Sequence, residues 1–180
     1  MIGHDLERGT GIPGDGPPDG APDATCVSCV ASTSELWHPS QLVVDPNNAD
    51  LLIGAAWHNH RLIQIDLQRD EISWLAGVGE PGFVDDPVVL NYPSSVVVDT
   101  DGSLIFSDQG NQVIRRLTVA GEVETIAGRP GLEGYSGDGG PASEAAFGSL
   151  AAECRSRAST SPRAARTTPS GCSWVSGERS

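Results

Sequence analysis

The sequence predicts an all-β fold made from two copies of one four-stranded antiparallel unit. Short runs of β-branched and aliphatic residues alternate with turns rich in Gly, Asp and Asn, which is the pattern of a β meander. The pattern occurs twice, and the motifs of the second copy follow those of the first by 51 to 54 residues. A repeat of about 40 to 50 residues with four strands has the size of one propeller blade. We therefore expect an incomplete β-propeller of two blades.

The second copy is the clearer of the two. Turns such as Asp101-Gly102, Gly110-Asn111 and Ala120-Gly121 end its apolar runs and predict three tight hairpins. Its four strands are expected at residues 95–99, 104–108, 113–117 and 123–127.

The first copy has the same order of strands and turns. Pro39 corresponds to Pro93, and Ala76 corresponds to Ala127. The spacing between the copies changes only within turns, so every strand keeps its place in the repeat. Its four strands are expected at residues 41–45, 51–55, 61–65 and 71–76.

The motifs of the second copy resemble the NHL repeat of β-propeller proteins of bacterial type. They include the aromatic-Pro-Ser motif at Tyr92, the Ser-Asp motif that ends at Asp108, and the Gly-Asn turn that precedes Arg115. Residues 137–145 resemble an inter-blade loop of that family. The first copy departs from the pattern, because Ala56 stands where Asp108 stands in the second copy. The resemblance implies a propeller that binds partners through its loops.

The family pattern also suggests how the chain is organised. Residues 1–35 are expected to be a largely irregular remnant of an inter-blade loop, residues 36–90 the first blade with its loop, and residues 91–149 the second blade with a Gly/Asp-rich loop. Residues 150–180 are rich in Ser and Arg, and we expect a disordered tail there, read from a shifted frame or native to the protein. The chain as a whole is expected to be a fragment of a longer propeller.

Composition argues against two classes of partner. The 24 acidic and 11 basic residues give the chain a formal charge of -13, which opposes binding to nucleic acid phosphates. No apolar run is long enough to predict a transmembrane span. The first residues lack the pattern of a secretory signal, so the sequence leaves the compartment open, with an extracytoplasmic parent protein as one alternative.

Strand direction predicts one face for binding. Alternate strands of a meander run in opposite directions, so the second-to-third-strand turns and the inter-blade loops lie at the same end of each blade. Long loops on a rigid scaffold commonly bind ligands. We expect this acidic loop face to bind a protein or a small ligand. Its candidate binding residues are Trp57, His58, His60, Gln109 and Asn111.

Several of these residues have alternative interpretations. His58 and His60 lie two apart on a turn, where they either are exposed polar residues or bind zinc or calcium with a third ligand from another blade. His38, before Pro39, is expected to be a packing residue, with a ligand role as the alternative. Trp57 is either a binding anchor or a packing residue, whereas Trp74 is expected to pack.

The remaining candidates are expected to be structural. Asp45, Asp99 and Asp108 each follow or end a strand, where a carboxylate caps a turn by accepting backbone hydrogen bonds. Cys26 and Cys29 are expected to form a local disulfide or to remain thiols, because the sequence lacks the second ligand pair of a structural zinc site.

These observations favour a non-catalytic propeller scaffold without a cofactor. No serine-hydrolase elbow or phosphate-binding loop occurs in the sequence. One alternative is a metal-dependent propeller lyase or hydrolase whose remaining ligands lie in other blades. A sensor or adhesion module that meets a basic partner is a third possibility. Because two blades leave sheet faces uncovered, the chain alone is expected to be marginally stable or prone to aggregate.

Overall fold

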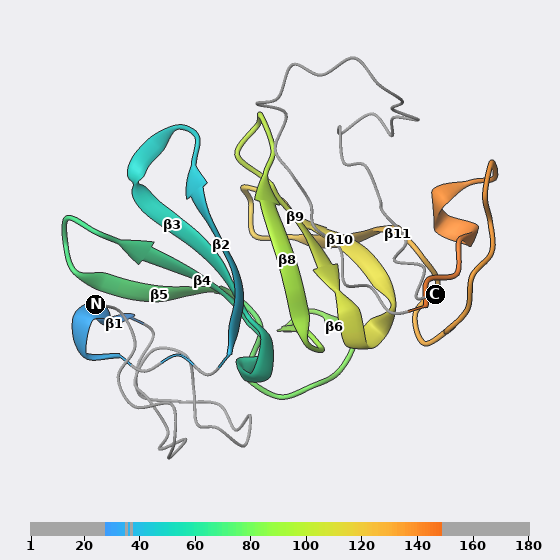
Figure 1. The fold of residues 1–180 in the computed structure, drawn as a ribbon, viewed down its shortest axis with the longest axis horizontal. Coiled ribbons are helices and arrows are strands. Elements are labelled where there is room, and N and C mark those ends of the chain that lie inside the picture. Colours follow the sequence, from blue (N-terminus) through green and yellow to red (C-terminus); the bar gives the residue numbers. More distant parts are fainter. Residues whose placement is uncertain (1–27, 35, 37, 149–180) are drawn as a thin grey trace, which may run out of the picture.

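The first sheet forms one blade with an additional edge strand. The computed structural model describes residues 28–34, 36 and 38–148 (Figure 1). All neighbouring strands of the first sheet are antiparallel, in the order β1-β5-β4-β3-β2. The strands are β1 (Ser28–Val30), β2 (Pro39–Asp45), β3 (Asn48–Ala56), β4 (Arg61–Asp66) and β5 (Glu71–Ala76). Short 3-10 turns η1 (Ala31–Thr33) and η2 (Trp57–Asn59) accompany them.

The second sheet is a four-stranded antiparallel meander in the order β11-β10-β9-β8. Its strands are β8 (Pro93–Val98), β9 (Leu104–Asp108), β10 (Val113–Leu117) and β11 (Val123–Ala127). The turn η3 (Gln109–Asn111) joins β9 to β10, and η4 (Ala142–Glu144) follows β11. A small hairpin of β6 (Val84–Asp85) and β7 (Val88–Val89) lies in the loop between the two sheets. The all-β class and the two four-stranded meanders predicted from the sequence are confirmed.

Strand β1 differs from the irregular chain expected before residue 36. Cys29 lies opposite Ile72, and the Ala31 amide donates to the carbonyl of Asp70 at 2.8 Å. The outer edge of the first blade thus has a partner for its backbone groups, which an open edge lacks. Three residues of strand are too short to show alternation in a sequence, so this pairing could not be read from it. Most of residues 1–35 and the tail from 150 lie outside the described residues.

The two blades pack face to face, with β2 and β8 side by side (Figure 1). A single apolar cluster joins them. The first blade contributes Ile53 and Leu62, and the second contributes Val96 and Phe106; all four side chains are buried. Because side chains alternate between the faces of a strand, each sheet presents one face to this cluster and the other face away from it. The arrangement is that of two successive blades of a propeller.

The repeat is also visible in the backbone. His38 and Tyr92, which occupy equivalent positions, have φ angles of 52° and 53°. Gly77 and Gly128 each follow a fourth strand, with φ angles of 95° and 91°. A Cβ atom on Gly77 would lie 2.2 Å from the His60 carbonyl oxygen, so only glycine fits there. The two copies therefore share special backbone positions as well as strands.

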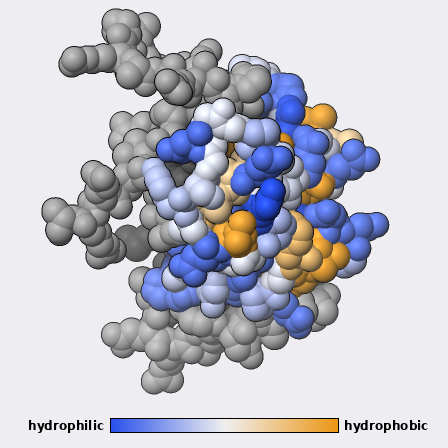
Figure 2. All heavy atoms as spheres, turned by 90° about the vertical axis from the view of Figure 1, so that its right-hand side faces the viewer, coloured by the Kyte–Doolittle hydropathy of each residue, from blue (hydrophilic) through white to orange (hydrophobic). Residues whose placement is uncertain are grey.

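The outward faces of the blades are partly uncovered. Leu42 is 46% exposed, whereas the equivalent Val96 is fully buried between the blades. Figure 2 shows the other end of the molecule, where hydrophobic residues lie among hydrophilic ones. The loop after β11 lies on that side and includes the exposed Leu132 and Tyr135. The first blade thus exposes an apolar side chain at a repeat position where the second blade has a buried one.

Candidate ligand-binding face

The turns η2 and η3 meet the loop between the blades at one end of the sheets. The amide of Gln109 donates to the carbonyl of Tyr92 at 3.3 Å, and the amide of Gly110 donates to that of Asn91 at 2.8 Å. Trp57, at the start of η2, donates its indole N–H to Gln109 Oε1 at 3.1 Å. The second-to-third-strand turns and an inter-blade loop therefore lie together, in the arrangement that strand direction predicts.

Four rings gather on this face, and we call them the aromatic cluster: His38, Trp57, His58 and Tyr92. The Trp57 ring lies 4.3 Å from the His58 ring and 4.9 Å from the Tyr92 ring, measured between centroids. Trp57, His58 and Tyr92 are each half-buried, and His38 is exposed. The cluster spans both blades, because Tyr92 precedes β8 while Trp57 and His58 follow β3. It leaves ring surface open beside polar groups.

His38 and His58 approach each other edge to face. Their ring centroids are 4.5 Å apart, and the two Nδ1 atoms are 2.6 Å apart. Burial lowers the pKa of His58, and the nearby His38 lowers it further. The sequence placed His38 in a packing role, but the structure brings its ring nitrogen to that of His58.

His60 has a different environment from His58. It is 4% exposed, and its Nδ1 accepts a hydrogen bond from the Tyr92 amide at 3.1 Å. Burial, followed by the effect of His58, lowers the pKa of His60 to about 4. His60 thus holds the second blade through its neutral ring. The described residues contain no group of three or more His, Cys, Asp or Glu side chains arranged to hold a metal.

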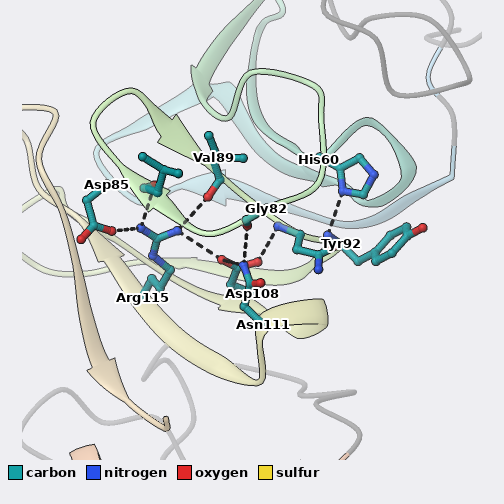
Figure 3. A network of polar contacts seen from close by, with 10 residues as sticks. His60, Gly82, Asp85, Val89, Tyr92, Asp108, Asn111 and Arg115 are labelled. Atoms are coloured by element: carbon teal, nitrogen blue, oxygen red, sulfur yellow. Dashed lines mark hydrogen bonds and ion pairs between the residues drawn. The ribbon is translucent and has the colours of Figure 1, made fainter. Parts of the chain in front are cut away.

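A buried polar network lies beneath this face (Figure 3). Asp108 accepts hydrogen bonds from the Asn91 amide at 2.7 Å and from Asn111 Nδ2 at 2.8 Å. It also pairs with Arg115, whose Nη1 lies 3.2 Å from Asp108 Oδ2. Asn111 donates to the Gly82 carbonyl at 2.7 Å as well. The network ties β9, η3 and β10 to the loop between the blades.

Arg115 extends the network to the small hairpin. Its guanidinium donates to the carbonyls of Val89 at 3.0 Å and Val84 at 3.4 Å, and it forms an ion pair with Asp85. The Arg115 side chain is fully buried, so these contacts replace the water it would bind in the unfolded chain. Arg115 thus fixes the small hairpin to the second blade, while Asp108 and Asn111 hold other parts of the same loop (Figure 3).

This network corrects the expected role of Asp108. The sequence predicted a cap for the turn that follows, yet the Asp108 side chain makes no capping hydrogen bond to η3. Its oxygens instead face the inter-blade loop and Arg115, because β9 directs the side chain into the blade junction. Burial raises the pKa of Asp108, against the opposing effects of Asn111, Asn91 and Arg115. Asn111 is buried in the same network, so it does not line the open face.

The other predicted structural residues have local partners. Asp45 Oδ1 accepts a hydrogen bond from the Asn47 amide at 2.8 Å, and Asp99 Oδ1 accepts one from the Thr100 amide at 2.7 Å. Trp74 is half-buried, with the guanidinium carbon of Arg61 3.6 Å above its ring. Cys29 is disulfide-bonded. Cys26 lies outside the described residues, so its pairing with Cys29 stays a prediction.

Sequence reasoning missed Tyr92 as a member of the candidate site and considered His38 only as an alternative ligand. Both precede a proline that begins an inner strand, and both have a positive φ that turns their rings toward η2 and the blade junction. The signal was present as the aromatic-Pro-Ser motif, which we took only as a repeat marker. Sequence reasoning also missed Asp85 as the ion-pair partner of Arg115, because Asp85 lies 30 residues away in a loop.

Comparison with known proteins extends to the fold alone. No protein-family model matches the chain, and no curated protein matches it. A Bacteroides thetaiotaomicron protein of unknown function matches in structure with a TM-score of 0.53 and 20% identity, over 60% of this chain and 28% of that one. An auxiliary nutrient binding protein from the same organism matches with a TM-score of 0.47 and 23% identity, over 60% and 30% of the two chains.

A streptogramin B lyase also matches, with a TM-score of 0.39 and 15% identity, over 49% of this chain and 26% of the lyase. The chain therefore spans well under half of the length of each of these solved structures. At such identities a likeness concerns the fold and says nothing of function.

Among the described residues, no helix has the length and apolar character that a membrane span requires.

Proposed function

We propose that the chain is part of an NHL-type β-propeller that acts as a non-catalytic binding scaffold. The observation that carries this proposal is the aromatic cluster, which sits where loops from both blades meet and is held from below by the Asp108–Arg115 network. Binding residues on loops work best when a rigid scaffold fixes them. The motifs of the two copies support the NHL-type assignment.

The chemistry of the cluster points to a ligand with a flat ring. Trp57 and Tyr92 present tilted, half-buried rings, and such rings bind aromatic groups and the apolar faces of sugars by stacking. Gln109 and His58 stand at their edge with amide and imidazole groups for hydrogen bonding. We propose that the ligand is an aromatic residue of a partner protein or a ring of a small molecule.

Ligand-observed NMR tests this proposal on the full chain. N-acetyltyrosine amide and methyl glucoside serve as the two ring probes, and we expect saturation transfer to at least one of them. Trp57→Ala removes the central ring and is expected to abolish the transfer. The control is Tyr135→Ala, which removes an aromatic ring that is 73% exposed in the loop after β11, outside the cluster.

Two outcomes would contradict the proposal. One is the absence of transfer to either probe in the wild-type chain. The other is equal transfer in the wild type and in Trp57→Ala, which would mean that the probe binds elsewhere. Circular dichroism of each variant shows whether the sheets remain intact, and Trp57→Phe, which keeps the packing but loses the bond to Gln109, separates folding from binding.

A further inference from the structure

The Nδ1 atoms of His38 and His58 share a hydrogen bond on the open face, with 2.6 Å between them. We propose that these two histidines form a binding site for a divalent transition metal of the zinc or nickel type. The proposal goes beyond the ring-binding function and does not depend on it, because it uses the edges of the imidazoles and not the faces of the aromatic rings.

The distance between the nitrogens suits a shared metal ion. A zinc–imidazole bond is about 2.0–2.1 Å long, so two nitrogens on one tetrahedral zinc are about 3.3 Å apart. The observed 2.6 Å is a hydrogen-bond distance, so the ion would replace the proton that the two nitrogens share, and the rings would separate by less than about 1 Å. His38 is exposed, so an ion can reach its ring from the solvent.

The surroundings hold His58 in place and keep it able to bind a metal. Its ring packs against Trp57 at 4.3 Å and contacts Tyr92 edge to face at 6.0 Å. A neutral imidazole coordinates a metal through a ring nitrogen. The acidic chain as a whole attracts cations.

Ligand type selects among metals. Imidazole nitrogens suit zinc, nickel and copper, whereas magnesium and calcium prefer oxygen ligands. Two protein ligands leave coordination positions for water or for a donor atom of another molecule. The pair also differs from the His58–His60 site considered from the sequence, because His60 directs its Nδ1 to the Tyr92 amide.

Calorimetric titration of the full chain, without an affinity tag, tests the site with zinc or nickel chloride alone. We expect one ion to bind per chain, and His38→Ala and His58→Ala each to weaken binding at least tenfold. Magnesium and calcium chloride are expected to give no binding at the same concentrations. The matched control is His60→Asn, because Asn tolerates the positive φ of this position and still offers an oxygen to the Tyr92 amide.

The control also distinguishes the two histidine pairs. Retained affinity in His60→Asn supports the His38–His58 site, and loss of affinity in that variant would overturn it in favour of a site that includes His60. Equal binding by the wild type and the His38→Ala/His58→Ala double variant would overturn the proposal too, because the ion would then bind elsewhere. Histidine nitrogen NMR on the wild type needs no variant: zinc should shift two Nδ1 resonances, and unchanged resonances would contradict the site.

Discussion

Arg115 and Asp108 form an ion pair in which both side chains are fully buried, with 3.2 Å between Nη1 and Oδ2. A buried pair is stable only if hydrogen bonds satisfy its remaining polar groups. Here the Asn91 amide and the Asn111 side chain bond the carboxylate, and two loop carbonyls with Asp85 bond the guanidinium, whose buried Nε has no hydrogen-bond partner. The pair therefore fixes the loop that carries Tyr92 into the candidate site.

We predict that Asp108→Ala lowers the free energy of unfolding by about 3–5 kcal/mol, because it removes the buried partner of Arg115 and leaves only the exposed Asp85 paired with that charge. Denaturant unfolding followed by circular dichroism measures the change. Asp101→Ala is the control: it removes an exposed carboxylate from Arg116, and exposed ion pairs contribute little. A similar loss in both variants would show that the buried pair has no special role.

Lowering the pH is expected to loosen the junction between the blades at His60. Its pKa falls from 6.5 in the unfolded chain to about 4 in the folded one, so the folded state binds this proton less readily. The stabilisation is present above pH 6.5 and is lost as the pH falls toward 4, by at most about 1.4 kcal/mol per pH unit. His58 shifts in the same direction.

Thermal melts of the wild type and His60→Asn between pH 7 and 4 measure this effect, and the wild type should lose more stability over that window. Asp108 acts in the opposite sense, because its raised pKa gives stability at low pH that is lost as the pH rises through the folded-state value. Both proteins contain Asp108, so its contribution to the pH dependence of stability cancels in the comparison. Parallel pH profiles for the two proteins would contradict the role given to His60.

We predict that Gly77→Ala destabilises the fold by about 3 kcal/mol or more, since its Cβ would collide with a backbone oxygen as well as adopt a left-handed conformation. Gly121→Ala is the matched control, with a φ of 87° and no atom within 4 Å of the added Cβ. The control should cost only about 1–2 kcal/mol. Chemical denaturation of the two variants gives the difference, and equal losses would argue against the close approach to His60.

The two equivalent positions Leu42 and Val96 should respond differently to truncation. Val96→Ala is expected to cost about 2 kcal/mol, because the side chain is fully buried between the blades. Leu42→Ala should cost less, because that side chain is nearly half exposed. Unfolding curves test both.

The exposed face of the first blade is also expected to promote self-association. Leu42 and Val44 are 46% and 54% exposed, and contiguous apolar side chains on a sheet favour association between copies. The double variant Leu42→Ser/Val44→Ser should shift the sedimentation profile toward smaller species. An unchanged profile, or a wild-type chain that is monomeric at every concentration, would contradict this expectation.

Much of the fold was predictable from local pattern. The four predicted strands of the second copy, at residues 95–99, 104–108, 113–117 and 123–127, overlap β8 to β11, and the same holds for the first copy. The sequence could not supply β1 or the hairpin of β6 and β7, because strands of two or three residues show no alternation. It also described Asp108 as a turn cap, since only the packed blade reveals that Asp108 faces a loop and Arg115.

The sequence by itself determined the strands, their order, the repeat and the glycines that follow each fourth strand, because each depends on the neighbours of a residue along the chain. Only the tertiary structure decided that His38 meets His58, that His60 holds Tyr92 and that Arg115 reaches Asp85. These contacts join residues 20 to 32 positions apart. Their distances depend on how strands pair, how the loop folds and how the two sheets pack, and no periodicity in the sequence encodes that.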